Sequence, residues 1–358
     1  MFKFIVRRLL QAIPTFFGIT LLSYALMALT PGGPVAALAF GANLTAREVE
    51  RLKIQLGVND PWPVQYVRWL VGDDWMRWDS DGDGIADGAV LIPLDVDGDG
   101  NPEPPGTRRG ILRGDFGNSF VFKRNAMEIL VERFPATFEL GFSSLLIGAL
   151  TGVVVGIFAA VNHKRWFDHI SRVAAVIFDA VPVFWLALIL LLLFGSQLGL
   201  LPLGGRCRPT LTDTCPPLHL RLEYLILPTF VLATGIIAGY SRFTRASMLD
   251  VVSQDYIRTA RAKGLSDRAI WVRHGARNAL IPIATFLGPA ITFILSGAAV
   301  TETIFSWPGV GRTVVNAVTS RDFPVVMATV IFTSLATILG YLLSDILYVI
   351  IDPRIRLE

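Results

Sequence analysis

Six long apolar runs divide the chain, and polar stretches separate them. The first, Leu9–Thr30, extends for 22 residues without a charged side chain. The others lie at about Ala136–Val161, Val173–Leu203, Tyr224–Ser241, Ala279–Thr301 and Val325–Ile351. About 20 apolar residues cross a bilayer as a helix, and a helix satisfies its own backbone hydrogen bonds in lipid. The pattern predicts an all-α membrane protein with six transmembrane helices.

The first run has two interpretations, a cleaved signal peptide or a retained span. A signal peptide has an apolar region of about 7–15 residues, followed by a small-residue cleavage site. The run here is longer and continues into Pro31-Gly32-Gly33-Pro34, which favours a retained span.

Composition supports the membrane assignment. Hydrophobic residues make up 53% of the chain and charged residues 17%, whereas soluble domains have about 25% charged residues. Residues 31–135 carry 16 acidic and 11 basic residues, and the rest of the chain carries 13 and 21. Such a division indicates two compartments more than a nucleic-acid partner, and we expect no nucleic acid to bind.

The positive-inside rule orients the spans. The N-terminus and the segments 162–172 and 242–278 are basic and fall on one side, with eight basic and three acidic residues in 242–278. We therefore expect both termini in the cytoplasm. The expected parts are a tail and first helix at 1–30, an extracytoplasmic region at 31–135, a core of five helices at 136–351, and a cytoplasmic tail at 352–358.

The cytoplasmic segment 242–278 contains a basic amphipathic stretch. Its helical spacing places Tyr256, Thr259, Ala260 and Lys263 on one face. A turn at Gly264-Leu265-Ser266 separates this helix from a second one, for which Ser266 is the expected N-cap. The residues alone leave two interpretations open, a docking surface for a protein and a basic loop attracted to anionic lipid.

A resemblance favours protein docking. The small pair Thr259-Ala260 is followed by Gly264 and then, seventeen residues after this glycine, by Ile281-Pro282. This pattern resembles the EAA-type cytoplasmic loop of ABC importer permeases, in the form found in the dipeptide/oligopeptide permease family. Arg258 stands where the general pattern has an acid, and Gly275 stands where a helix-favouring residue is usual.

The resemblance covers nearly the whole chain. Supporting stretches are Thr30-Pro31-Gly32, Leu56–Pro61, Gly114–Ser119, Arg133–Thr137, Leu200-Leu201-Pro202, Phe305–Gly311 and Ile351–Arg354. It implies the type I ABC importer permease fold in a bacterial or archaeal cytoplasmic (inner) membrane, with a loop of coupling helices seated in a partner ATPase. The implied coupling residues are Tyr256, Arg258, Thr259, Ala260, Arg261, Lys263, Gly264, Leu265, His274, Arg277, Asn278 and Pro282.

The resemblance also implies a function, the ATP-driven import of dipeptides or oligopeptides by alternating access. Nickel complexes, glutathione and oligosaccharides are alternative cargoes within the same family. The implied partners are a second homologous permease, two cytoplasmic ABC ATPase subunits and an extracytoplasmic substrate-binding protein. The sequence contains no Gly-x-x-x-x-Gly-Lys-Ser/Thr phosphate loop, so we expect a transport subunit and not an enzyme.

An acidic insertion at about 72–110 interrupts the family-like pattern. It contains two Asp-rich segments, 79–87 and 95–103, with a period of 16 residues. Oxygen ligands in this spacing, with glycine at the sixth position, are typical of calcium loops, although the Glu at position 12 of an EF-hand is absent. The predicted calcium ligands are Asp79, Asp81, Asp83, Ile85, Asp87, Asp95, Asp97, Asp99, Asn101 and Glu103.

This insertion supports an alternative of another class, a calcium-responsive membrane receptor or channel. A receptor or channel of this kind would not need the EAA-like loop. The other interpretation of the insertion itself is a flexible acidic loop that binds no metal.

Three further features carry predictions. Cys207 and Cys215 lie in an external segment, where an oxidising compartment favours a disulfide over two free thiols. Asp179 and Asp345 lie within spans and are candidates for the translocation pathway, since intramembrane acids are costly and often functional. Pro182 predicts a kink after Asp179, and Trp307 is expected either to touch the binding protein or to anchor at the membrane interface.

Overall fold

The computed structural model of the chain describes residues 2–29, 62–72, 109–208, 215–276, 279–280 and 286–351. Within these ranges the chain consists of helices and their connections, with an isolated bridge between Asn118 and Asn125. Two compact units are present, one of residues 1–10, 133–313 and 335–358, the other of residues 11–132 and 314–334. The prediction of an all-α membrane protein is confirmed.

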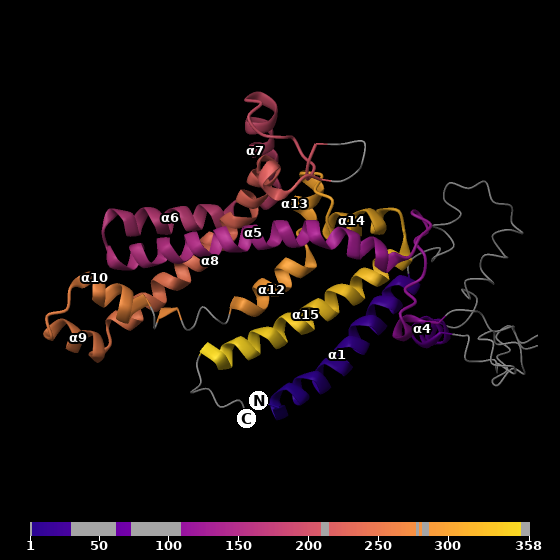
Figure 1. Cartoon of the computed structure of the whole chain (residues 1–358), viewed down its shortest axis with the longest axis horizontal. Coiled ribbons are helices and arrows are strands. Elements are labelled where there is room, and N and C mark those ends of the chain that lie inside the picture. The colour runs from indigo at the N-terminus through magenta and orange to yellow at the C-terminus, as the bar shows by residue number, and fades with distance from the viewer. Residues whose placement is uncertain are drawn as a thin grey trace, which may run out of the picture. The chain divides into compact units, whose positions relative to one another are not determined.

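The main helices are labelled in Figure 1. They are α1 (Phe2–Ala28), α4 (Trp62–Val71), α5 (Ala126–Val161), α6 (Trp166–Ala180), α7 (Val183–Leu190), α8 (Leu222–Val252), α9 (Asp255–Ala262), α10 (Asp267–Ala269), α12 (Leu287–Ser296), α13 (Ala299–Ile304), α14 (Val310–Thr319) and α15 (Phe323–Ile351).

Among the described residues, four helices are long and apolar enough to cross a membrane: α1, α5, α8 and α15. The pair α6 and α7, extended by a π-helical segment at Leu191–Gln197, gives a fifth span if the pair is counted as one. The sixth predicted span, Ala279–Thr301, contains α12 and the start of α13, but residues 281–285 lie outside the described residues. The count of six therefore stays a prediction.

The helices extend beyond the apolar runs that predicted them. α5 begins at Ala126, ten residues before its run, and α8 continues to Val252, eleven residues past Ser241. Hydropathy marks the length of chain that suits lipid, whereas a helix continues wherever its backbone remains hydrogen-bonded. At 31 residues, α8 is about 46 Å long, well beyond a hydrocarbon core of about 30 Å.

The expected kink at Pro182 is confirmed, and the change in helix direction is large enough to separate α6 from α7. The axes of α6 and α7 differ by 97°. Val181 adopts an extended conformation with ψ of 122°, as the ring of a following proline favours. Figure 1 shows α7 turning away from the line of α6.

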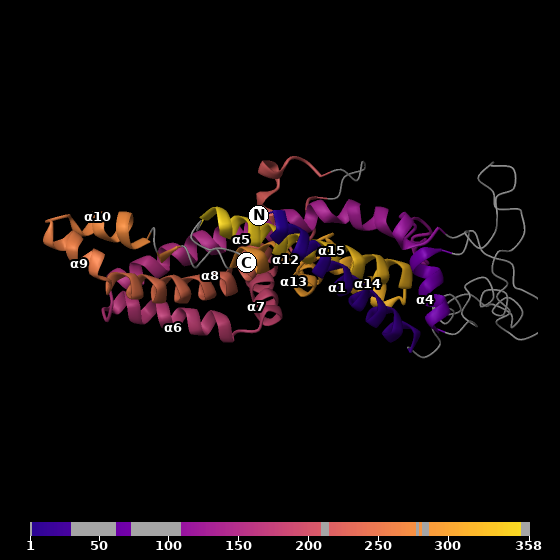
Figure 2. The same ribbon diagram turned by 90° about the horizontal axis from the view of Figure 1, so that it is seen from below.

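A row of glycines brings α5 against α8 in the first unit. Gly148, Gly152 and Gly156 follow one another at four-residue spacing on α5. A Cβ atom on Gly152 would lie 2.7 Å from the Tyr240 Cβ and 3.0 Å from the carbonyl oxygen of Ile237. Small residues at such spacing allow two membrane helices to approach by their backbones. Figures 1 and 2 both show α5, α6 and α8 side by side.

The turn between α13 and α14 is fastened to α5 within the same unit. Trp307 is fully buried, and its Nε1–H donates to the carbonyl of Ala136 over 2.8 Å. Both interpretations of Trp307 from the sequence, contact with a binding protein and an interfacial anchor, required exposure and are wrong. The buried Glu302 accepts hydrogen bonds from Thr137 Oγ1 at 3.0 Å and from the Arg312 backbone at 2.9 Å.

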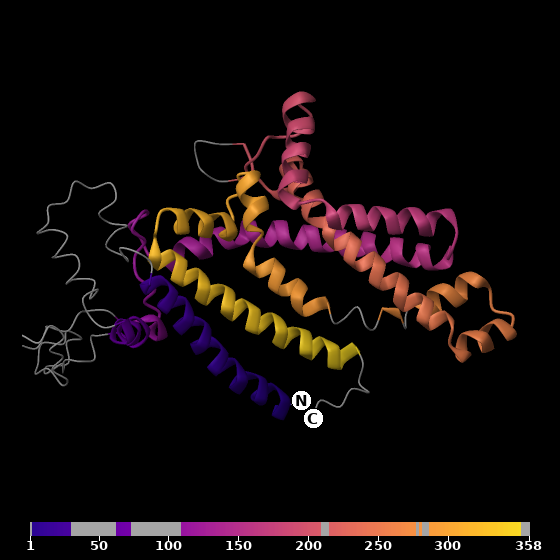
Figure 3. The same ribbon diagram turned by 180° about the vertical axis from the view of Figure 1, so that it is seen from behind.

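The second unit has an aromatic core. Tyr24 of α1, Tyr66 and Leu70 of α4 and Met327 of α15 form a buried cluster. The hydroxyl groups of Thr20 and Tyr66 are 3.0 Å apart inside it. Figure 3 shows α15 running beside α1, with α4 near the end of α1.

The glycine row generates a prediction about stability. We expect Gly152→Ala to lower the apparent melting temperature of the detergent-solubilised protein, because its new methyl group meets backbone atoms of α8 that cannot rotate away. Overpacking of this kind costs about 1–3 kcal/mol. The matched control is Gly235→Ala on α8, where no heavy atom lies within 4 Å of an added Cβ. Equal melting temperatures for the two variants would contradict the prediction.

Candidate functional site

The stretch that resembles a coupling loop forms two helical pieces around Gly264, as predicted. α9 ends at Ala262, and α10 begins at Asp267 and continues as a π-helical segment from Ile270 to Ala276. Ser266 occupies the N-cap position in an extended conformation, but its side chain makes no capping hydrogen bond, contrary to the expectation. Figure 2 shows α9 and α10 beyond the end of α8.

Gly264 closes α9 with a Schellman motif. Its backbone N–H donates to the Arg261 carbonyl at 2.9 Å, and the N–H of Leu265 donates to the Ala260 carbonyl at 3.3 Å. This motif needs a left-handed residue, and Gly264 has φ of +74°. No heavy atom lies within 4 Å of an added Cβ, so the requirement for glycine at this position is purely conformational.

One face of α9 holds the loop against the rest of the unit. Ile257 and Ala260 are buried and pack against Ile270, with Val251 of α8 at their edge. The sequence analysis placed Ala260 on one face with Tyr256, Thr259 and Lys263, and in the structure Ala260 lies at the buried edge of that face. The largest apolar side chain of α9 is Ile257, and its burial turns Ala260, three residues further along the helix, to the inside.

The opposite face is cationic and solvent-exposed. Arg258 has 73% of its side chain exposed, and its Nη1 lies 3.5 Å from the carboxylate of Asp255. Tyr256 and Leu265 are each 42% exposed. The further exposed residues among the predicted coupling residues are Thr259, Arg261, Lys263 and Gly264. The exposed surface therefore carries three cationic side chains, those of Arg258, Arg261 and Lys263. It also carries two large side chains with apolar surface, those of Tyr256 and Leu265.

Gly275 departs from the family pattern for a local reason. A Cβ atom there would lie 3.3 Å from Cε of the fully buried Met248 on α8. The glycine thus leaves room for a methionine that packs with Ala160, Ala276 and Ala279. The remaining predicted coupling residues are not tested, because Arg277, Asn278 and Pro282 and the side chain of His274 lie outside the described residues.

Ion pairs join α8 to α6 above this loop. The Asp168 side chain is 1% exposed. Arg245 donates a hydrogen bond to each of its carboxylate oxygens, from Nε at 2.5 Å and from Nη2 at 2.9 Å. The backbone N–H of Lys164 donates to the same carboxylate at 2.9 Å. The sequence analysis counted Asp168 and Arg245 as loop charges and missed their pairing, because nothing in a single sequence relates residues 77 positions apart.

Both acids proposed for the translocation pathway have basic partners. Asp179 Oδ2 lies 2.9 Å from an Nη of Arg242, and Asp345 Oδ2 lies 2.9 Å from Nε of Arg8. Arg242 was assigned to the cytoplasmic loop because the apolar run ends at Ser241. The continuation of α8 to Val252 places it on a span helix.

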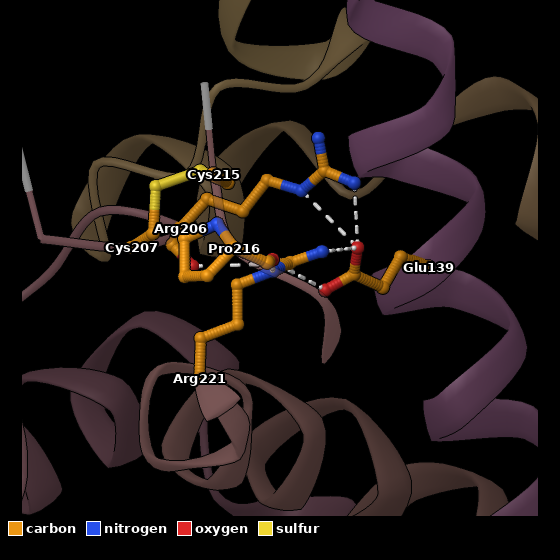
Figure 4. The surroundings of a disulfide bond; sticks show 6 residues. All are labelled: Glu139, Arg206, Cys207, Cys215, Pro216 and Arg221. Carbon is orange, nitrogen blue, oxygen red and sulfur yellow. Dashed lines mark hydrogen bonds and ion pairs between the residues drawn. A yellow bond between two sulfur atoms is a disulfide. The ribbon is translucent and has the colours of Figure 1, made fainter. Parts of the chain in front are cut away.

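A charge cluster fastens the segment between α7 and α8 to α5 (Figure 4). Arg221 binds Glu139 through both guanidinium Nη atoms, at 2.6 and 2.7 Å, and Arg206 binds it at 2.6 and 3.1 Å. The Sγ atoms of Cys207 and Cys215 are joined in the structure, directly after Arg206 and before Pro216, whose carbonyl accepts from Arg221 Nε. One carboxylate thus orients both ends of the loop between the cysteines.

The predicted calcium ligands, Asp79 to Glu103, lie outside the described residues. Among the residues that the structure does describe, no group of three or more His, Cys, Asp or Glu side chains is placed to hold a metal ion.

Comparison with known proteins identifies the family. A family model described as "Binding-protein-dependent transport system inner membrane component" matches residues 152–357, and the model of its N-terminal part matches residues 1–78. The chain is 35% identical over 357 residues to the oligopeptide transport system permease protein AppB of Bacillus subtilis, covering 99% of this chain and 100% of the relative.

Two further relatives differ in the cargo that they are named for. The dipeptide transport system permease protein DppB of Haemophilus influenzae is 36% identical over 371 residues, with 99% of this chain and 100% of the relative covered. The glutathione transport system permease protein GsiC of Salmonella paratyphi A is 34% identical over 356 residues, with 99% of each covered. The resemblance inferred from the loop motif is confirmed, and the chain belongs to the family of binding-protein-dependent transport system inner membrane components.

Proposed function

We propose that this chain is the permease subunit of an ATP-driven importer that moves peptides into the cytoplasm. The observation that carries the proposal is the identity of 35–36% over nearly the full length of permeases named for oligopeptide and dipeptide transport. Glutathione, itself a small peptide, is the alternative cargo with a named relative. Family membership favours an importer over a calcium-responsive receptor or channel.

The partners follow from the same proposal. The six predicted spans leave room for half of a pathway, so a second permease of similar fold completes it. Two cytoplasmic ATPases bind and hydrolyse ATP, and an extracytoplasmic binding protein delivers the peptide. The chain's own contribution is to receive motion at its cytoplasmic loop and to convert that motion into alternate opening of the pathway.

The geometry of the loop suits that role. A partner ATPase would contact the exposed face of α9 and the turn that follows it. Arg258, Arg261 and Lys263 supply charge there, and Leu265 supplies an apolar anchor. Ile257 and Ala260 tie α9 to the end of α8. The Asp168–Arg245 pair ties α8 to α6, so a displacement of α9 is carried to two span helices together.

The turn at Gly264 provides the test. We expect Gly264→Val to reduce co-purification of the ATPase subunits about tenfold or more, because a left-handed conformation costs a side chain about 1–2 kcal/mol and the exposed face of α9 is then misaligned. The measurement is quantitative pull-down of the assembled transporter from solubilised membranes.

A matched control exists at Gly114. Gly114 has φ of +82°, no heavy atom lies within 4 Å of an added Cβ, and it lies in the predicted extracytoplasmic region. Gly114→Val imposes the same kind of backbone strain and should leave ATPase binding intact. Unchanged ATPase binding in the Gly264 variant would count against the coupling role of the loop.

We further propose that Cys207 and Cys215 form a disulfide in the cell. An extracytoplasmic location favours oxidation, and Glu139 holds Arg206 and Arg221 so that the flanking chain segments stay close. We expect neither thiol to be alkylated in intact protein and both to be alkylated after reduction, as read by mass spectrometry. Alkylation of both thiols without a reductant would rule out the disulfide.

Calcium binding by the acidic insertion is a proposal that rests on the spacing of its oxygen ligands alone. We expect the full-length protein in detergent to bind calcium with a Kd at or below about 1 mM, the range of extracellular calcium modules. The double variant Asp81→Asn/Asp97→Asn should lose this binding, while Asp250→Asn, an exposed acid on α8, should keep it. Isothermal titration that detects no binding to the unmodified protein would reject the proposal.

A further inference from the structure

The ion pair between Asp179 and Arg242 is much more exposed than the two other pairs that Arg221 and Arg245, at the ends of α8, make with α5 and α6. The Asp179 and Arg242 side chains are 53% and 45% exposed. By contrast, Asp168 and Arg245 are 1% and 18% exposed, and Glu139 and Arg221 are 10% and 7% exposed. The two more buried pairs fasten elements together, whereas half of each charged group in the Asp179–Arg242 pair remains available to something else.

Lipid is an unsuitable neighbour for this pair. Asp179 lies six residues after Val173, where the predicted span begins, which is about 9 Å of helix rise. Charged groups at such depth are costly against hydrocarbon and almost always face a bundle interior or a water-filled cavity. The exposed sides of the two groups therefore face a polar space or another protein surface.

The break in the span indicates a polar space. α6 ends at Ala180, one residue after Asp179, and α7 starts at Val183 in a direction 97° away. A break leaves backbone carbonyl and N–H groups without partners, which at membrane depth is tolerated where the backbone is buried in protein or lines a water-filled cavity. Broken helices of this kind recur at the substrate sites of membrane transporters.

The geometry points to a site in the translocation pathway where Asp179 binds the α-ammonium group and Arg242 the α-carboxylate of a peptide. This inference rests on the proposed peptide import. The two groups neutralise each other at 2.9 Å when no peptide is present, and a zwitterion offers each of them an opposite charge in exchange. Phe184 and Trp185, 53% and 50% exposed at the start of α7, provide apolar contact for the peptide's side chains.

Cysteine protection tests each half of the site separately. Asp179→Cys leaves Arg242 in place, and Arg242→Cys leaves Asp179 in place. The only native cysteines of the chain are Cys207 and Cys215, and mass spectrometry of this chain reads the reaction at the introduced cysteine separately from them. The assembled transporter is placed in vesicles whose cytoplasmic face is accessible, and a charged, membrane-impermeant thiol reagent is added with or without dialanine.

We expect both thiols to react and dialanine to slow the reaction about tenfold at a concentration ten times its Kd. End-blocked peptides separate the two roles. Dialanine amide should fail to protect the Asp179→Cys variant, which retains the carboxylate-binding Arg242. N-acetyl-dialanine should fail to protect the Arg242→Cys variant, which retains the ammonium-binding Asp179. Asp250→Cys, at an exposed position on α8, is the matched control and should react without protection by any peptide.

Two results would overturn the inference. One is a lack of reaction at both positions, which would mean that the second permease subunit covers the pair. The other is a reaction that dialanine does not slow, or one that dialanine and its end-blocked forms slow equally. Uptake of labelled dialanine by the unmodified transporter is measured in parallel. If that uptake is absent, the proposed peptide function fails; if uptake occurs without protection, the site alone fails.

Discussion

The close approach of α5 and α8 is the contact on which the first unit depends. Three glycines on α5 remove side chains where the backbone of α8 passes, and without them the two helices would be held apart. Arg221 is the N-cap residue of α8, and Arg245 lies near the C-terminal end of the helix. The packing of α5 against α8 therefore determines where both anchoring ion pairs form, and where α9 emerges.

This arrangement makes α8 a stiff connection between the loop around Gly264 and the break between α6 and α7. Its 31 residues extend past the predicted span into the polar region, where Met248 packs under Gly275 and Val251 packs under α9. A helix with buried contacts along its length moves as one body. The bend between α6 and α7 lies beside it, and a backbone that is already broken there can change direction without losing further helical hydrogen bonds.

Much of this could be predicted from local sequence patterns. Apolar runs predicted the long helices, a Pro predicted the bend, and the spacing around Gly264 predicted two helical pieces and the family. These signals succeed because lipid imposes helix length, and because a left-handed turn needs glycine. The four-residue spacing of Gly148, Gly152 and Gly156 was also visible in the sequence and marks a helix contact, although it does not name the partner helix.

The contacts between distant residues could not be predicted in this way. Hydropathy ended the fourth span at Ser241 and so placed Arg242 in the cytoplasm, one residue from the limit. A charged residue interrupts an apolar run whether the helix stops or continues, so the run did not reveal that α8 continues through Arg242 or that Arg242 pairs with Asp179. Likewise, the amphipathic pattern of α9 did not distinguish the face buried by Ile257 from the exposed one, since Ala260 suits either.

The exposure of an ion pair indicates whether its charges hold the structure together or can exchange their partner for a ligand. A pair that is almost completely buried loses its hydration and recovers the cost only through fixed geometry, so it resists any exchange of partner. Asp168–Arg245 and Glu139–Arg221 meet that description at the two ends of α8. A half-exposed pair keeps part of its hydration and exchanges partners at little cost. Asp179–Arg242 has that property at the break in the span, where a passing zwitterion would need it.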